Sequence, residues 1–172
     1  MFDRAVANTA IRYGVTGGIV SFLYMAILAL LGFENPYDDP SEFSSTLVFV
    51  SVFVFLAIKY FKKFNDEALG FGRAFKVGFA TTFYLAFTTA VLMCIFSFFV
   101  GAELIQQYIV AKQAEMQLNR EVVVQVMGQV NYERGLNGLQ ELNAFDLAKR
   151  TFVYRIILGI IISLVLAIFF RK

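Results

Sequence analysis

The sequence contains no histidine and only one cysteine among its 172 residues. Without histidine the chain has no imidazole acid or base, no Ser-His-Asp or Cys-His nucleophile, and no His-ligated zinc or haem. The single cysteine, Cys94, lies inside a long hydrophobic run. Because it is the only cysteine, an intramolecular disulfide and a Cys-x-x-Cys metal site are excluded. We therefore expect no catalytic residue, no cofactor and no metal, and a protein that is not an enzyme.

Charge is also scarce. Charged residues make up 16% of the chain and hydrophobic residues 59%, against about 25% and about 45–50% in ordinary soluble domains. The net charge is only +2, and no basic cluster outside the expected membrane flanks is typical of a nucleic-acid surface. We exclude nucleic acid as a partner and interpret residues 1–172 as one membrane domain.

Long apolar runs occupy most of the sequence. A helix needs about 20 apolar residues to cross a membrane, and we expect spans at about residues 11–33, 44–61, 73–100 and 152–170. The second run alternates Val and Phe as a strand would, but a lone strand cannot satisfy its backbone in lipid, which favours a helix. A cleaved signal peptide is the alternative for the first run.

The pattern changes in residues 101–150. Apolar residues there recur at three- to four-residue steps, which predicts an amphipathic helix to about Gly128 and, after a bend, a short helix over about 139–150. This helix could lie on the outer leaflet, but its mixed-sign charge favours contact with protein. The expected fold is an all-α integral membrane protein, with four transmembrane helices and an extramembrane helical hairpin between the third and fourth.

Lysine and arginine are distributed unevenly along this topology, which predicts that both termini are cytoplasmic. One side holds Arg4, Arg12, Lys59, Lys62, Lys63, Arg73, Lys76, Arg171 and Lys172, and the other holds Lys112, Arg120, Arg134, Lys149, Arg150 and Arg155.

Four sets of residues are assigned structural roles. Small residues that let helices approach are assigned to helix packing: Gly14, Gly17, Gly18, Ser21, Gly78, Gly159 and Ser163. Cations at span ends are assigned to lipid headgroups or to topology: Lys62, Lys63, Arg73 and Lys76. Glu103 and Arg155 are expected at the outer interface, as an ion pair or as independent snorkelling side chains. Asn8 or Thr9 is expected to cap the first helix.

Two stretches suggest ligands but lack the full patterns. The acidic loop at 34–45 offers carboxylates to a Ca²⁺-like ion without the glycine order of an EF-hand, so we interpret it as a solvated loop. Gly70 and Gly72 precede a helix, but a third glycine and a Gly-Lys-Ser/Thr sequence are missing. Because we expect no ionisable residue at mid-span, the sequence argues against a proton- or ion-coupled pump.

One unit of the sequence carries a family resemblance. The run Lys59-Tyr60-Phe61-Lys62-Lys63 is followed by a short turn and by Phe71-Gly72-Arg73-Ala74-Phe75-Lys76-Val77-Gly78, and Leu158-Gly159-Ile160 opens a glycine-bearing stretch near the end. This arrangement resembles the domain of unknown function 4199, a family of small four-span membrane proteins found mainly in Bacteroidota. The resemblance implies a location in the bacterial inner (cytoplasmic) membrane, and it gives no information about an activity.

The leading functional hypothesis is a structural or accessory subunit that assembles with itself or with other membrane protein subunits, through the hairpin and the glycine-bearing spans. The alternative is an oligomeric small-solute permeation or lipid-handling protein, whose pore would be lined by the hydroxyls of the third span, which are Thr81, Thr82, Thr88, Thr89 and Ser97. Membrane lipids are expected partners in either case.

Overall fold

The computed structural model describes residues 3–171, and all regular structure in that range is helical. In chain order the helices are α1 (Arg4–Leu30), α2 (Asp39–Phe64), α3 (Phe71–Phe99), α4 (Ala102–Leu118), α5 (Arg120–Met127), α6 (Gln129–Gln140) and α7 (Ala144–Phe170). Four of them, α1, α2, α3 and α7, are long and apolar enough to cross a membrane. The all-α fold with four spans is therefore confirmed.

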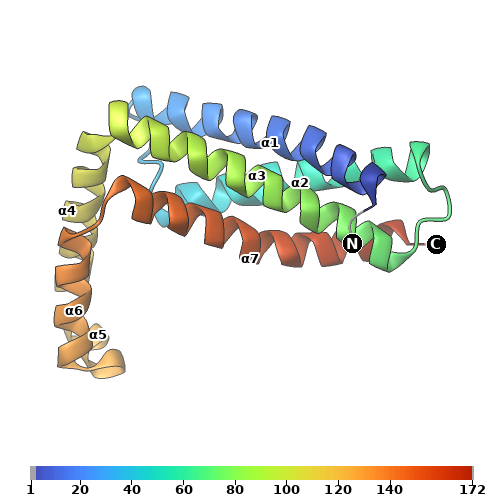
Figure 1. Ribbon diagram of the computed structural model, residues 1–172. Helices are drawn as coiled ribbons and strands as arrows, with labels where there is room; N and C mark the ends of the chain where they lie inside the picture. The colour runs from blue at the N-terminus through green and yellow to red at the C-terminus, as the bar shows by residue number, and fades with distance from the viewer. Residues whose placement is uncertain (1–2, 172) are drawn as a thin grey trace.

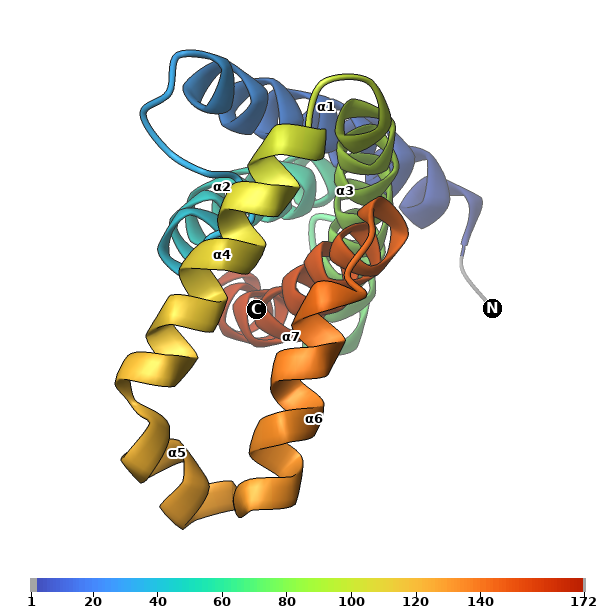
Figure 2. The same cartoon turned by 90° about the vertical axis from the view of Figure 1, so that its left-hand side faces the viewer.

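The helices form two parts with different directions (Figure 1). The four long helices lie side by side as a bundle, and α4, α5 and α6 form an arm, residues 102–140, at one end of it. The arm runs across the bundle axis and extends sideways past the bundle, as the view along that axis also shows (Figure 2). Both ends of the chain lie at the opposite end of the bundle from the arm (Figure 1).

The ends of α1 and α2 differ from expectation. The side chain of Asp3 caps α1 by accepting a hydrogen bond from the backbone N–H of Ala5, so the predicted cap at Asn8 or Thr9 is wrong. The helix α2 begins at Asp39, because Pro40 in its first turn needs no N–H partner there. The loop is correspondingly shorter than predicted, and the spans extend beyond their apolar cores since charged residues can continue a helix outside the hydrocarbon.

The helices within residues 101–150 also differ from the predicted ones. The predicted helix to about Gly128 is broken at Asn119 and ends at Gly128, whose φ of +83° places it in the left-handed region that favours glycine. The predicted short helix over 139–150 is wrong, because α6 ends at Gln140 and a new helix starts at Ala144. Asn143 caps that start, its side-chain oxygen accepting from the N–H groups of Phe145 and Asp146.

Small residues lie where the bundle helices are closest. A Cβ at Gly14 would lie 2.7 Å from the carbonyl oxygen of Thr81, and one at Gly18 would lie 2.9 Å from the carbonyl oxygen of Leu85, so α1 packs directly on the backbone of α3. A Cβ at Gly17 would meet the ring of Phe53 on α2 at 2.6 Å. At these three positions any side chain would force the helices apart.

The same close packing joins α3 to α7. A Cβ at Gly78 would lie 3.0 Å from Ser163 Oγ, and Ser163 is itself fully buried. A Cβ at Gly159 would lie 2.8 Å from Thr82 Oγ1. The small-residue faces of the spans are thus occupied by contacts within the chain.

Candidate functional site

Polar side chains gather where the arm meets the bundle. We call this group the joint, and its members are Tyr37 of the α1–α2 loop, Asp39 and Glu42 of α2, Tyr108 and Lys112 of α4, and Arg150 of α7. It brings together residues as far apart in the sequence as Asp39 and Arg150, and it ties the arm to two of the membrane helices.

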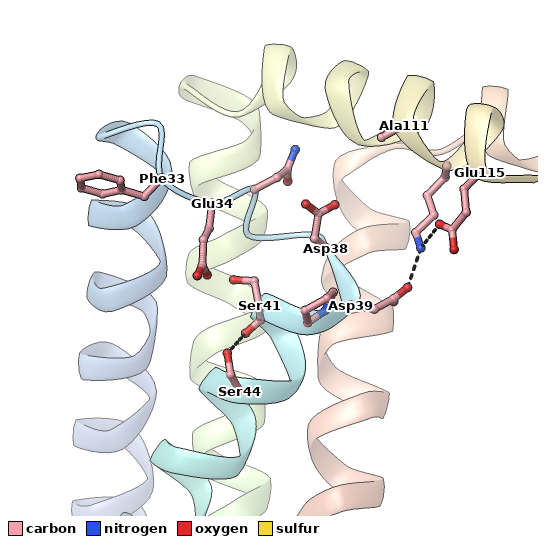
Figure 3. Close-up of a pocket in the computed structure, with 11 residues that line it drawn as sticks. Phe33, Glu34, Asp38, Asp39, Ser41, Ser44, Ala111 and Glu115 are labelled. Atoms are coloured by element: carbon pink, nitrogen blue, oxygen red, sulfur yellow. Dashed lines mark hydrogen bonds and ion pairs between the residues drawn. The ribbon is translucent and has the colours of Figure 1, made fainter.

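Asp39 is the centre of the joint. One carboxylate oxygen lies 2.6 Å from Lys112 Nζ, and the other accepts from Arg150. Lys112 also donates to Glu115 at 2.8 Å, so a single amine bridges two carboxylates (Figure 3). Because Asp39, Lys112 and Arg150 belong to three different helices, this carboxylate fixes α4 against α2 and α7.

Arg150 uses its planar fork in several directions. It donates to the backbone carbonyl of Tyr37 at 3.2 Å and to the hydroxyl of Tyr108, and it lies 3.4 Å from Glu42 Oε2. Its guanidinium carbon also sits 5.4 Å from the centroid of the Tyr108 ring. A guanidinium can satisfy this combination of planar and stacked contacts, and an ammonium group cannot.

Protonation in the joint is strongly biased. Burial alone would lower the pKa of Lys112, but its hydrogen bonds to Asp39 and Glu115 outweigh this and raise the pKa. Burial raises the pKa of the Tyr37 and Tyr108 phenols. At neutral pH Lys112 is therefore charged and both tyrosines are protonated, which gives the joint a fixed set of charges and donors.

A cavity of about 860 Å³ opens beside the joint, between the α1–α2 loop and α4 (Figure 3). The acidic residues of this region have separate environments: Glu34 is exposed, Asp38 precedes α2, Asp39 is ion-paired, and Glu42 is 1% exposed. Over residues 3–171, no three carboxylates, histidines or cysteines are grouped as a metal ion would need. The region holds the arm through ion pairs between charges of opposite sign.

Further along α7 from the joint, towards the middle of the bundle, Arg155 is completely buried. Its guanidinium donates to Ser21 Oγ at 2.9 Å and Ser45 Oγ at 3.3 Å, and it contacts Met25 Sδ at 3.1 Å. Arg155 lies eleven residues after the start of α7, about 16 Å along the helix axis. Ionisable residues this deep in a span are costly and usually functional.

Arg155 corrects two expectations. Neither alternative for Arg155 holds: it forms no ion pair with Glu103, which is exposed at the start of α4, and it does not snorkel to the interface, because it faces the bundle interior. The expectation that mid-span positions carry no ionisable group is also wrong. Among the described side chains, no carboxylate lies within 4 Å of this guanidinium, and Arg155 Nε and Glu42 Oε1 have no hydrogen-bond partner.

The cations assigned to headgroups or topology all lie at the end of the bundle that holds the termini. Lys62 Nζ donates to the carbonyl of Phe170 at 2.9 Å, and Lys63 lies over the ring of Phe64. Arg73 pairs with Asp66 at 2.8 Å, and Lys76 is exposed. Contacts within the chain thus hold three of these four side chains.

Sequence reasoning missed the joint and the surroundings of Arg155. The only signal was compositional: a serine at position 21 interrupts the first apolar run, a serine at position 45 immediately precedes the second, and an arginine interrupts the fourth. Spacing along one helix cannot show that these residues face one another across three helices, because only the tertiary packing decides it.

Four long apolar helices with lipid-facing side chains such as Ile157 and Ile161, each more than half exposed, define a multi-pass integral membrane protein. The family model described as Protein of unknown function (DUF4199) matches residues 12–172, so the chain belongs to this family and the resemblance seen in the sequence is confirmed. The comparisons with curated proteins and with solved structures give no match.

Proposed function

We propose that this protein is a non-enzymatic assembly subunit of a bacterial inner-membrane complex, which uses its arm to hold a neighbouring membrane protein. The observation that carries the proposal is the direction of the arm. It extends sideways from the end of the bundle (Figures 1 and 2), so in a membrane it runs along the surface and reaches over whatever lies beside the bundle.

The far end of the arm supports this role because it is apolar and uncovered. Leu118 is 88% exposed and Val126 is 80% exposed, and Val122 and Val130 are both more than 60% exposed. We call these four residues the arm tip. No residue of α5 is buried. Exposed apolar groups clustered in this way are typical of a protein contact surface.

Charge favours a protein over a lipid surface as the partner of the arm tip. The arm carries four glutamates and three cations, a net charge of −1. Helices that bind membrane surfaces instead have polar faces rich in Lys and Arg. The arm and an anionic leaflet therefore have no net attraction.

Packing inside the arm and the bonds of the joint make the arm a stiff support. Tyr132 of α6 is 4% exposed and lies 5.9 Å from the Arg120 guanidinium, and Gly135 allows Met116 to approach α6 closely. The bonds of Asp39 to Lys112 and Arg150 then fix the base of the arm. A partner at the arm tip is held at a defined distance from the bundle.

The packing of the spans argues for the arm, and against the glycine faces, as the contact surface. Those glycines already contact α2, α3 and α7 within the chain. The hydroxyls of Thr81, Thr82 and Thr89 are also fully buried, and Thr89 donates to the carbonyl of Leu85 at 2.9 Å. This arrangement favours helix packing over an oligomeric pore lined by these threonines.

The proposal is tested by photocrosslinking in cells. A photoreactive amino acid at Leu118 or Val126 is expected to give one discrete protein adduct, identified by mass spectrometry. The same group at Val165, a lipid-facing position of α7 that is 47% exposed, serves as the matched control and is expected not to give it. The double variant Leu118→Asp/Val126→Asp should lose the captured protein in a mild-detergent pull-down. Lipid adducts alone at the arm tip, or unchanged capture by the double variant, would count against the proposal.

Orientation is tested separately. A reporter fused after Lys172 is expected to be active only in the cytoplasm, because the cations near both termini lie at that end of the bundle. Activity of a periplasmic reporter at the same position would place the arm on the cytoplasmic side.

A further inference from the structure

We propose that a groove between α3 and α7 binds one anionic phospholipid, with an acyl chain in the groove and the headgroup phosphate beside Lys149. This inference goes beyond the assembly role, which concerns the arm tip. The groove is a surface of the bundle itself, on the half that is closer to the arm.

The groove has an apolar lining and a volume of about 530 Å³. Ala90 and Ala148 are both 7% exposed and leave a hollow, while the ring of Phe87 beside them is 54% exposed. Phe83 stacks parallel to Phe87 with centroids 6.4 Å apart, and Phe152 meets Phe83 edge-on at 5.8 Å. Small residues between aromatic rings thus form a channel of the kind an alkyl chain fills.

The length and position of the groove match one leaflet. Its lining residues on α3 run from Phe83 to Ile95, a distance of about 18 Å along the helix. Half of the hydrocarbon core is about 15 Å. Phe83 lies two residues from the midpoint of α3, so the groove extends from the bilayer centre to the interface on the arm side. That is the path of a single acyl chain.

Lys149 supplies the charge that selects a headgroup. It is the one charged residue of the lining, it is exposed, and it forms no ion pair with any residue between 3 and 171. The neighbouring cation, Arg150, is already held in the joint, and Asp146 accepts a hydrogen bond from Asn143. Lys149 lies five residues into α7, so its flexible stem can place the ammonium at headgroup level.

A lipid fits this groove better than a helix of a second copy. A packed helix makes contact along the whole span, whereas this groove covers only the arm-side half. A helix would also remove the ammonium of Lys149 from water, and burying an unpaired charge is costly. The carboxylates at this end of the long helices are already engaged, Asp39 and Glu42 by Arg150 and Asp146 by Asn143. An anionic phospholipid fills the same space and pairs with the charge.

The experiment uses the absence of tryptophan from the chain. The variant Phe87→Trp places a single tryptophan in the groove, and brominated phosphatidylglycerol or brominated phosphatidylcholine in mixed vesicles quenches its fluorescence on contact. Ile19→Trp on α1 is the matched control, because Ile19 is 42% exposed and, like Phe87, lies two residues to the arm side of its helix midpoint. We expect saturable quenching with a preference for phosphatidylglycerol at position 87, and no preference at position 19.

Lys149→Gln in the Phe87→Trp background should weaken the preference for phosphatidylglycerol about five-fold, the effect of one cation beside an anionic lipid. Lys59→Gln, at the other end of the bundle, should leave it unchanged. Equal quenching by both lipids at position 87, or a preference that survives Lys149→Gln, would overturn the proposal. So would efficient disulfide crosslinking between copies through Cys94, which lines the groove, because a second copy would then occupy it.

Discussion

Substitution of Gly159, which contacts Thr82, is the most demanding test of the helix packing in the bundle. A methyl group at Gly159 would lie 2.8 Å from Thr82 Oγ1, 3.0 Å from its Cβ and closer still to its Cγ2. Thr82 has little room to move, since it is fully buried and its hydroxyl lies 3.4 Å from Ser163 Oγ. Gly159→Ala must therefore push α7 away from α3 or distort both helices.

The expected cost follows from two opposing effects. Overpacking a well-filled interior costs about 1–3 kcal/mol, and a contact this close belongs at the upper end. Replacing a helical glycine by alanine returns about 1 kcal/mol of helix propensity. The net loss is about 2 kcal/mol, which lowers the melting temperature of a chain of this size by roughly 4–8 °C.

Thermal unfolding in a mild detergent, followed by circular dichroism, measures this loss. Thr82→Ala removes the two atoms that clash most, so the double variant Gly159→Ala/Thr82→Ala should be less destabilised than the sum of the single changes. Gly138→Ala is the control, because a Cβ at Gly138 of α6 has no neighbour within 4 Å. The packing argument fails if Gly159→Ala has the same melting temperature as the wild type, or if the double variant loses as much stability as the two single changes added together.

Three further predictions concern charge. Arg155→Met should leave the melting temperature unchanged or higher, because it removes a buried charge that has no carboxylate within 4 Å and is therefore costly to keep out of water; a drop of the size expected for Gly159→Ala would contradict this. Asp39→Asn should weaken the bonds to Lys112 and Arg150, so amide hydrogen exchange in α4 should accelerate while that of α1 and α3 stays the same. If α4 exchanges at the same rate in Asp39→Asn as in the wild type, the joint does not hold the arm. Burial raises the pKa of Asp38 above its ordinary value of 3.8, although Lys112 opposes this, so the folded state keeps this proton to higher pH than the unfolded chain and the charged form reduces stability. Asp38→Asn should therefore melt higher than the wild type at pH 7, and the difference should vanish below pH 3.8; a gain that is independent of pH would disprove this account.

The number and type of the spans could be predicted because each depends on one local property, an apolar run long enough for a bilayer. The boundaries were less accurate, since α2 begins at Asp39 and α7 at Ala144, well before their apolar runs. Hydropathy reports where the hydrocarbon lies, whereas the helix continues as long as its backbone bonds and caps allow, as Asn143 does for α7.

Arg155 shows a different limit. Its place in the sequence, three residues into the predicted fourth span, suggested a side chain that reaches the interface. The structure turns it inward because hydroxyls on two other helices, Ser21 and Ser45, converge on it. The joint could not be predicted for the same reason: Asp39 and Arg150 are 111 residues apart, and no local pattern encodes their pairing.

The placement of both chain ends at the opposite end of the bundle from the arm has a practical consequence (Figure 1). An affinity handle on either terminus would anchor the molecule, in a nanodisc, with its arm pointing away from the solid support. A sensor chip loaded in this way would offer the same uniformly oriented surface to any analyte injected over it, whichever terminus carries the handle.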